Sequence, residues 1–221
     1  MKVTDGIYCY PWTNMMDNNC NSYILKGGTT ILIDPGLKRY VPALLISAKQ
    51  DGINPDDISM IINTHGHPDH LDGNAYFLDH DIKVALSEEE GKFLESIGKD
   101  FFRMFGLDHP AGKIDFSLKE GPLKIEDIEL EVLLTPGHSP GSICLYWKDK
   151  KALISGDVVF AGSIGRTDFP GCSGEQMKQS IERLSELDVE YLLPGHNENM
   201  TGKNEIKRNF EFIKQAFFSY L

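Results

Sequence analysis

Four potential metal ligands lie within six consecutive positions of this sequence. The segment 63–73 reads Asn-Thr-His-Gly-His-Pro-Asp-His-Leu-Asp-Gly and supplies His65, His67, Asp69 and His70. Imidazole nitrogens and carboxylate oxygens are ligands that Zn²⁺ and similar divalent ions prefer in proteins. Because the 221 residues contain seven histidines in all, three of them in one such segment favour a metal site over a polar loop with scattered histidines.

The residues around this segment predict where it lies in the fold. The preceding Ile58-Ser-Met-Ile-Ile62 is apolar and rich in β-branched residues, which is typical of a buried strand. A glycine and a proline within the segment let the backbone turn sharply between the ligands. We therefore expect the ligands to follow a strand end, where His65 and His67 converge on one ion. Asp69 and His70 would point toward a second ion.

Three later segments share one pattern, in which an apolar strand runs through a small or turn-forming residue to a potential metal ligand. These segments are 132–138, 152–157 and 191–196, and they end in His138, Asp157 and His196. Each of these ligands alone reads equally well as a turn histidine or a loop-capping aspartate. Side chains at the carboxyl ends of neighbouring strands meet at one edge of a sheet. The four segments together therefore predict one metal centre.

The second half of the chain repeats the strand-turn-strand rhythm of the first. Residues 21–34 and 142–155 each contain two apolar strands around a short polar turn, and each hairpin precedes a helix and another strand. No Pro/Ser-rich linker separates the two halves. A length of 221 residues suits one large domain or two small ones. We therefore expect one α/β domain over residues 1–221, built from two similar β/α halves.

Periodicity and turn signals predict the individual elements. Strands are expected at 7–12, 21–26, 29–34, 58–62, 82–86, 114–118, 123–125, 128–134, 142–147, 151–155 and 191–193, and helices at 40–50, 71–80, 173–187 and 204–221. Another helix should begin after Ser87, which can cap it, with Glu90 at the third helical position. The aromatic stretch 101–111 lacks a clear period; we expect it to pack against the core, with a lid over the site as the alternative.

Charge, hydropathy and cysteine content indicate which partners and which cellular compartment to expect. The formal net charge of −11 argues against a nucleic-acid partner, since such proteins use Lys and Arg to neutralise phosphates. The longest apolar runs are strand-sized, so we expect no membrane span. The N-terminus has no apolar signal-peptide core, and the cysteines form no Cys-x-x-Cys pair. We therefore expect a cytoplasmic protein with reduced thiols at Cys9, Cys20, Cys144 and Cys172.

The segment Thr64-His-Gly-His-Pro-Asp-His70 with Gly73, followed by His138, Asp157 and His196 in this order, resembles the metallo-β-lactamase superfamily. The resemblance implies an αββα sandwich with the site at one edge. It also implies a ligand set, in which one metal is held by His65, His67 and His138, a second by Asp69, His70 and His196, and both by a bridging Asp157. The implied cofactors are two divalent ions, Zn²⁺ first, with Fe or Mn as alternatives.

A narrower likeness concerns two loops, Pro136-Gly-His-Ser-Pro-Gly-Ser142 and Gly165-Arg-Thr-Asp-Phe-Pro-Gly171, which are similar to those of glyoxalase II-like enzymes. That branch hydrolyses thioesters such as S-lactoylglutathione. The implied function is therefore a metal-dependent thioesterase, with a small-molecule thioester as its partner. The sequence ends 25 residues after His196, without the helical C-terminal domain of full-length glyoxalase II, which leaves glutathione specificity open.

The same resemblance implies catalytic roles for two side chains. Asp69 would orient the metal-activated water that attacks the thioester, in addition to binding metal. Arg166 would contact a substrate carboxylate, and an ion pair with Asp168 is the alternative. His80 and His109 match no motif position, so we expect them to be surface or core residues.

Other functions fit the same motifs. The stretch Gly-Arg-Thr-Asp-Phe at 165–169 is also similar to persulfide dioxygenases, which use a single iron. A different ester or lactone hydrolase of this fold, or a metal-binding protein without turnover, would carry the same ligands. A nucleic-acid-processing member of the superfamily is disfavoured by the acidity of the chain. The sequence makes no prediction of the oligomeric state.

Overall fold

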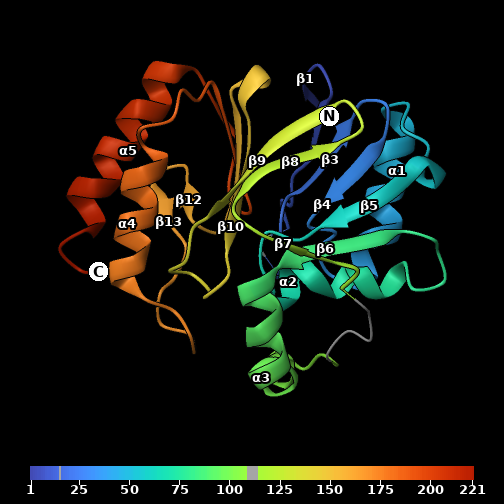
Figure 1. Ribbon diagram of the computed structural model, residues 1–221, viewed down its shortest axis with the longest axis horizontal. Helices are drawn as coiled ribbons and strands as arrows, with labels where there is room; N and C mark the ends of the chain where they lie inside the picture. The colour runs from blue at the N-terminus through green and yellow to red at the C-terminus, as the bar shows by residue number, and fades with distance from the viewer. Residues whose placement is uncertain (15, 109–113) are drawn as a thin grey trace.

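Two β-sheets pack face to face, and helices cover the outer face of each sheet (Figure 1). The computed structural model describes residues 1–14, 16–108 and 114–221. The layers follow the order helix, sheet, sheet, helix, which confirms the predicted αββα sandwich. Within the described part of the chain, no helix is both long enough and apolar enough to span a bilayer.

The first sheet is formed by the N-terminal half of the chain, with its strands in sequence order. Among the described residues it contains β1 (Lys2–Thr4), β2 (Ile7–Tyr10), β3 (Ser22–Lys26), β4 (Thr30–Ile33), β5 (Ile58–Ile62), β6 (Lys83–Ser87) and β7 (Phe116–Leu118). The strands β1 to β4 pair antiparallel, whereas β4 to β7 pair parallel. The carboxyl ends of β4 and β5 therefore lie together at one edge.

The second sheet has the order β15-β14-β11-β10-β9-β8. Its strands are β8 (Gly121–Ile125), β9 (Ile128–Leu134), β10 (Ile143–Trp147), β11 (Ala152–Gly156), β14 (Tyr191–Pro194) and β15 (Met200–Thr201). The strands β11 and β14 pair parallel, and their neighbours pair antiparallel. A separate small hairpin follows β11 and consists of β12 (Val159–Phe160) and β13 (Ser163–Ile164).

Helices cover the outer faces of the sheets, because each helix buries its apolar side against a sheet. The described α-helices are α1 (Val41–Gln50), α2 (Pro68–Leu71), α3 (Glu88–Met104), α4 (Gly174–Leu184) and α5 (Lys203–Phe217). Short 3₁₀ turns occur at η1 (Lys38–Tyr40), η2 (Pro55–Asp57), η3 (Asp72–Tyr76) and η4 (Lys148–Lys150). Helices α4 and α5 pack on the second sheet, whereas α1 and α3 pack on the first. The central core lies between the sheets and is filled by side chains such as Ile33, Leu145 and Ile154.

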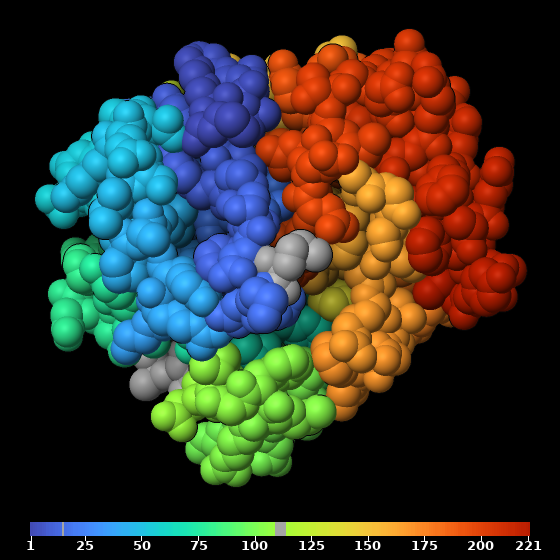
Figure 2. Space-filling view, turned by 180° about the vertical axis from the view of Figure 1, so that it is seen from behind, coloured from blue at the N-terminus to red at the C-terminus, as the bar shows by residue number. Residues whose placement is uncertain are grey.

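The two halves have matching topology, as the repeated rhythm of the sequence predicts. In the first half the antiparallel hairpin β3–β4 is followed by α1 and the parallel strand β5. In the second half the hairpin β10–β11 is followed by α4 and the parallel strand β14. A parallel neighbour requires a crossover, which each helix provides. Figure 2 shows the N-terminal half, in blue to green, beside the C-terminal half, in orange to red.

The helix expected at 71–80 is wrong in its bounds. The helix α2 already begins at Pro68, and the 3₁₀ turn η3 ends at Tyr76. Proline suits the first helical position because it lacks an N–H that would go unpaired there. This early start places Asp69 and His70 in the first helical turn rather than in a loop.

The aromatic stretch 101–111 contributes to packing where the structure describes it. Phe101 and Phe102 lie in the last turn of α3, fully buried against the first sheet. The later part of this stretch, 109–111, lies outside the described residues. The short strands β1, β12, β13 and β15 went unpredicted because two or three residues carry too little periodicity to be recognised.

Candidate metal centre

The predicted ligands from the four strand-end segments lie together at one edge of the sandwich. They form three overlapping groups whose ligand atoms lie within 4.8 Å of one another: His65, His67 and His138; His65, His70 and Asp157; and Asp69, His70 and His196. The first and last groups have the composition that the family resemblance implies. The segments follow β5, β9, β11 and β14. Because β4–β5 and β11–β14 pair parallel, the carboxyl ends of the strands in each pair lie at the same edge of their sheet.

Asp157 lies between the two outer groups. Its Oδ1 is 3.2 Å from His70 Nε2, and its Oδ2 is 3.4 Å from His138 Nε2 and 3.3 Å from His196 Nε2. This position suits a carboxylate that reaches both groups. Gly195 makes the close approach possible, because a Cβ at that position would lie 2.3 Å from Asp157 Oδ1.

The donor atoms of the three-histidine group fit a metal ion. The Nε2 atoms of His65, His67 and His138 are buried and make no hydrogen bond within the described residues. The opposite ring nitrogen is held in two cases, since His138 Nδ1 lies 2.8 Å from the Arg166 carbonyl oxygen and His65 Nδ1 lies 3.1 Å from Thr64 Oγ1. Metal-binding histidines usually have such a partner on the second nitrogen, which fixes the tautomer. Three buried imidazole nitrogens that lie close together and make no hydrogen bond among the described residues suit a divalent cation.

The charge states differ between the two outer groups. Burial lowers the pKa of His67 to about 3 and holds the pKa of His65 well below its usual value, so both rings are neutral and can donate a lone pair. Burial also disfavours charge on His196, but Asp157 and Asp69 raise the pKa of His196 to about 10. Burial would raise the pKa of Asp69, yet the hydrogen bond from His196 and the charge of His70 lower it to about 2. The second group therefore contains one ionised carboxylate, Asp69, that can bind a cation.

Asp34 belongs to the site, and the sequence analysis missed it. It follows β4 directly, and its Oδ2 lies 2.9 Å from His70 Nδ1 and accepts a hydrogen bond of 2.7 Å from Thr64 Oγ1. Its Oδ1 accepts a hydrogen bond of 2.8 Å from the Thr64 backbone N–H. The carboxylate is 1% exposed and orients a predicted ligand from behind. The available signal was the same strand-end pattern, because Asp34 also follows an apolar strand and precedes Pro35.

Glu90 is a second missed residue. Ser87 caps α3 as predicted by accepting a hydrogen bond from the Glu90 backbone N–H, but the Glu90 side chain points inward. Its Oε1 accepts from the Gly66 N–H at 2.8 Å, and its Oε2 accepts from Ser139 Oγ at 2.7 Å and from the Gly141 N–H at 2.8 Å. Burial raises the pKa of Glu90, and these three donors oppose that effect. One buried carboxylate thus joins the loop of His65 and His67 to the loop of His138.

The asparagine-rich turn before β3 contacts the other group. Asn18 Nδ2 donates a hydrogen bond of 2.7 Å to Asp69 Oδ2. Asn21 Nδ2 donates to the carbonyl oxygens of Pro194 and Asn197, on either side of His196. The sequence places Asn18 in a polar turn and predicts Asn21 as the start of a strand, and it gives no sign of these contacts because the partners lie far along the chain.

Arg166 reaches the site through its backbone. Its carbonyl oxygen contacts His138, whereas its guanidinium makes two hydrogen bonds, of 2.6 Å and 2.8 Å, to the Asp168 carboxylate. The guanidinium also lies 3.7 Å from the centroid of the Phe169 ring. The ion pair with Asp168, which the sequence analysis gave as the alternative, is therefore present. Contact between Arg166 and a substrate carboxylate remains an untested prediction, and the ion pair favours the alternative.

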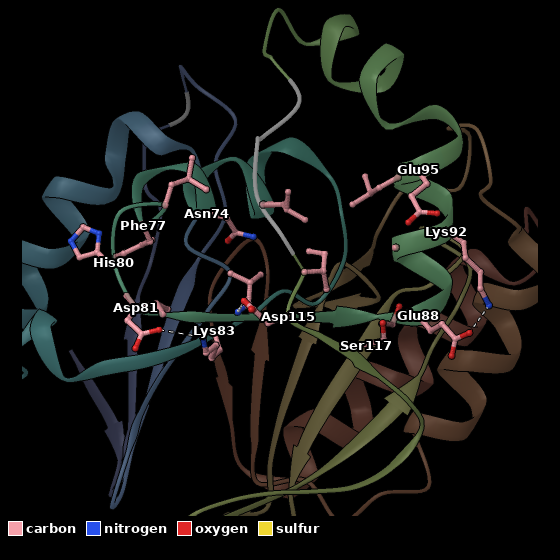
Figure 3. A pocket seen from close by; sticks show the side chains of 18 of the residues that line it. Asn74, Phe77, His80, Asp81, Lys83, Glu88, Lys92, Glu95, Asp115 and Ser117 are labelled. Carbon is pink, nitrogen blue, oxygen red and sulfur yellow. Dashed lines mark hydrogen bonds and ion pairs between the residues drawn. The ribbon is translucent and has the colours of Figure 1, made fainter.

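A sizeable cavity among the described residues lies away from the predicted ligands. It has a volume of about 820 Å³ and is lined by parts of η3, β6 and α3, with none of the seven predicted ligands (Figure 3). Asn74 and Phe77 line one side, and Glu88 and Lys92 of α3 line the other. His80 also lines this cavity and is exposed, as expected for a residue outside the motifs. His109 lies outside the described residues.

Comparison with known proteins agrees with this geometry. Residues 15–196 match the metallo-beta-lactamase superfamily. The probable metallo-hydrolase MJ0888 of Methanocaldococcus jannaschii is 33% identical over 184 residues, which cover 80% of this chain and 87% of that protein. The hydroxyacylglutathione hydrolase GloC of Haemophilus influenzae is 30% identical over 200 residues, which cover 88% of this chain and 92% of that protein.

Solved structures share the same architecture. The crystal structure of TTHA1623 in a di-iron-bound form matches with a TM-score of 0.74 and 27% identity. The match covers 97% of this chain and 100% of that chain. The sandwich, the strand-end ligands and the sequence matches thus lead to one assignment. The chain belongs to the metallo-β-lactamase superfamily, and its relatives there include probable metallo-hydrolases.

Proposed function

We propose that this protein is a metal-dependent hydrolase that cleaves small-molecule thioesters. One observation carries the proposal: seven histidine and aspartate side chains converge in the grouping of a two-metal site, and three imidazole Nε2 atoms there have no hydrogen-bond partner among the described residues. The likeness to a hydroxyacylglutathione hydrolase supports thioesters as the substrate class. S-lactoylglutathione is the first substrate to test.

The proposed metal ligands are those implied by the family pattern. His65, His67 and His138 would hold one divalent ion, with Zn, Fe or Mn as candidates. A second ion would be held by Asp69, His70 and His196, with Asp157 contacting both. Bound ions would supply an acidified water as nucleophile and would polarise the thioester carbonyl.

The chain's own residues would position the reacting groups. Asp69 is held by Asn18 and by His196, at 2.7 Å and 3.2 Å, so its carboxylate has a defined direction at the rim of the site. We infer that it accepts a hydrogen bond from the attacking water and aligns it. Hydrolysis would form a C–O bond, break the C–S bond and release a thiol. A thiol has a pKa near 8.5, so the thiolate leaves without a strong general acid.

The test is thiol release from S-lactoylglutathione by purified, metal-loaded protein, with chelator-treated protein as the control. We expect a kcat/KM at or above about 10⁴ M⁻¹s⁻¹, which is ordinary for an enzyme on its own substrate. Absence of thiol release from all thioesters tested would contradict the proposal.

A mononuclear-iron persulfide dioxygenase is the second candidate. It is supported by the loop Gly-Arg-Thr-Asp-Phe at 165–169, whose backbone contacts a predicted ligand through the Arg166 carbonyl oxygen. It requires oxygen uptake with a persulfide and one iron per chain. Measuring oxygen consumption and metal content on the same preparation separates the two candidates.

A further inference from the structure

Two phenylalanines contact His67 of the three-histidine group, and a third packs on both of them. Phe101 and Phe169 lie with ring centroids 4.9 Å and 5.7 Å from the ring of His67. Phe105 completes the set, at 5.3 Å from Phe101 and 5.8 Å from Phe169. We call Phe101, Phe105 and Phe169 the phenylalanine wall. Its rings contact one another edge to face, which is a favoured aromatic geometry and gives the wall a defined shape.

The phenylalanine wall meets the space beside the predicted ligands through Phe105. Phe101 is 1% exposed and forms its base, whereas Phe105 is 43% exposed. A small cavity of about 100 Å³ is lined by both Phe105 and Asp69, together with Leu107 and Pro68. A group bound beside Asp69 would therefore meet carbon atoms of several side chains.

The two arginines near the phenylalanine wall are already paired. Arg39 lines the same cavity, and its Nη2 lies 2.6 Å from Asp17 Oδ2, which also accepts a hydrogen bond from the Tyr40 hydroxyl. Arg166 is held by Asp168 in a bidentate pair and stacks on Phe169. Because a carboxylate already neutralises each guanidinium, a substrate carboxylate is attracted to it less strongly. Both arginines thus contribute neutral ion pairs to the rim.

We propose that the thioester cleaved at this site carries an apolar acyl group, which packs on the phenylalanine wall, in preference to a small hydroxyacyl group such as lactoyl. This inference rests on the proposed thioesterase function and names its substrate class. Burial of each additional CH₂ group is worth about fourfold in binding. A buried hydroxyl without a partner costs binding instead, because it loses its hydrogen bonds to water. The reaction itself is unchanged: water and the thioester give a carboxylic acid and a thiol.

The experiment varies the acyl group on one thiol. Thiol release is measured for S-acetyl-, S-lactoyl- and S-phenylacetylglutathione with the metal-loaded protein. We expect kcat/KM to be at least about tenfold higher for the phenylacetyl than for the lactoyl thioester. Equal rates, or a preference for lactoyl, would overturn the inference and leave the thioesterase function in place. Cleavage of none of the three would overturn both.

A pair of variants tests whether the phenylalanine wall is responsible. Phe105→Ala should lower kcat/KM for the phenylacetyl thioester about tenfold and change the value for the acetyl thioester less than about twofold. Phe116→Ala is the matched control, because Phe116 is similarly exposed, at 49%, and lies on β7 outside the wall. An equal loss on both substrates in Phe105→Ala, or the same selective loss in Phe116→Ala, would refute the proposed role of the wall.

Discussion

Glu90 and Gly66 are joined by a buried hydrogen bond of 2.8 Å between the glutamate Oε1 and the glycine N–H. Gly66 separates two predicted ligands, His65 and His67, so helix α3 holds the backbone of the ligand segment from behind. The other oxygen of Glu90 holds the loop that carries His138. The distance between the two loops is therefore set by a side chain that is no ligand itself.

Glu90→Gln should weaken metal binding while leaving the protein folded. The amide nitrogen cannot accept a hydrogen bond, so at least one of the three donors loses its partner. Loss of such a supporting contact typically costs about 10–100-fold in metal affinity. Competition with a chromogenic chelator measures this affinity.

Ser180→Ala is the matched control for Glu90→Gln. Ser180 is also buried and bonds the Pro136 carbonyl oxygen at 2.7 Å, near the His138 loop, but it does not join the two loops. We expect this variant to bind metal like the unchanged protein. Unchanged affinity in Glu90→Gln would assign Glu90 a role in folding alone.

Asp34→Asn should destabilise the fold as well as the second ligand group. The carboxylate takes two hydrogen bonds from Thr64 and contacts His70 Nδ1, and an amide cannot accept all three. Hydrogen bonds to buried charged groups contribute roughly 1.5–3 kcal/mol each. Urea unfolding measures the loss, with Asp127→Asn as a control, since Asp127 accepts its hydrogen bond from Gly28 at an exposed site. A stability equal to that of the control variant would disprove this role.

Asp157→Ala should remove bound metal and activity together. Its carboxylate lies within 3.4 Å of imidazole nitrogens from both outer groups, so its loss would remove a proposed ligand from both metals. Elemental analysis of the purified variant and a thioesterase assay measure the two losses. Full activity with only one metal lost would contradict a bridging position.

Arg166→Ala distinguishes the two roles given to this side chain. Because the guanidinium is engaged by Asp168 and Phe169, we expect the ratio of KM values for acidic and neutral thioesters to stay within about twofold of the original. Arg103→Ala is the control, since Arg103 forms an exposed ion pair with Asp100 on α3. A selective rise in KM for acidic thioesters would instead identify Arg166 as a contact for a substrate carboxylate.

Metal binding should release protons near neutral pH. Burial opposes charge on His196, but Asp157 and Asp69 raise its pKa to about 10, so the ring is protonated at pH 7 until a cation displaces the proton. A raised pKa means that the proton is held below pH 10 and lost above it, so apparent metal affinity should increase as the pH rises toward 10. Calorimetric titrations in buffers of different ionisation enthalpy measure the number of protons released. A heat independent of the buffer would contradict the prediction.

The positions of most strands and of the predicted ligands along the chain could be read from the sequence because both are local features. The run at 58–62 is apolar and β-branched, and His65 follows it within three positions. The repeated hairpins likewise indicated two β/α halves, since a hairpin needs only two short strands and a turn. The bounds of α2 were less predictable, because a single proline shifted its start to residue 68.

The supporting residues were decided by the tertiary structure alone. Glu90 satisfies every local rule for a helix N-terminus, yet its side chain bonds residues 24 and 51 positions away in the chain. The phenylalanine wall joins the end of α3 to a loop more than sixty residues later, around Phe169. Candidate metal ligands can be recognised in a sequence because only a few kinds of side chain bind a cation. A glutamate or a phenylalanine has many possible roles, and only packing in three dimensions selects one of them.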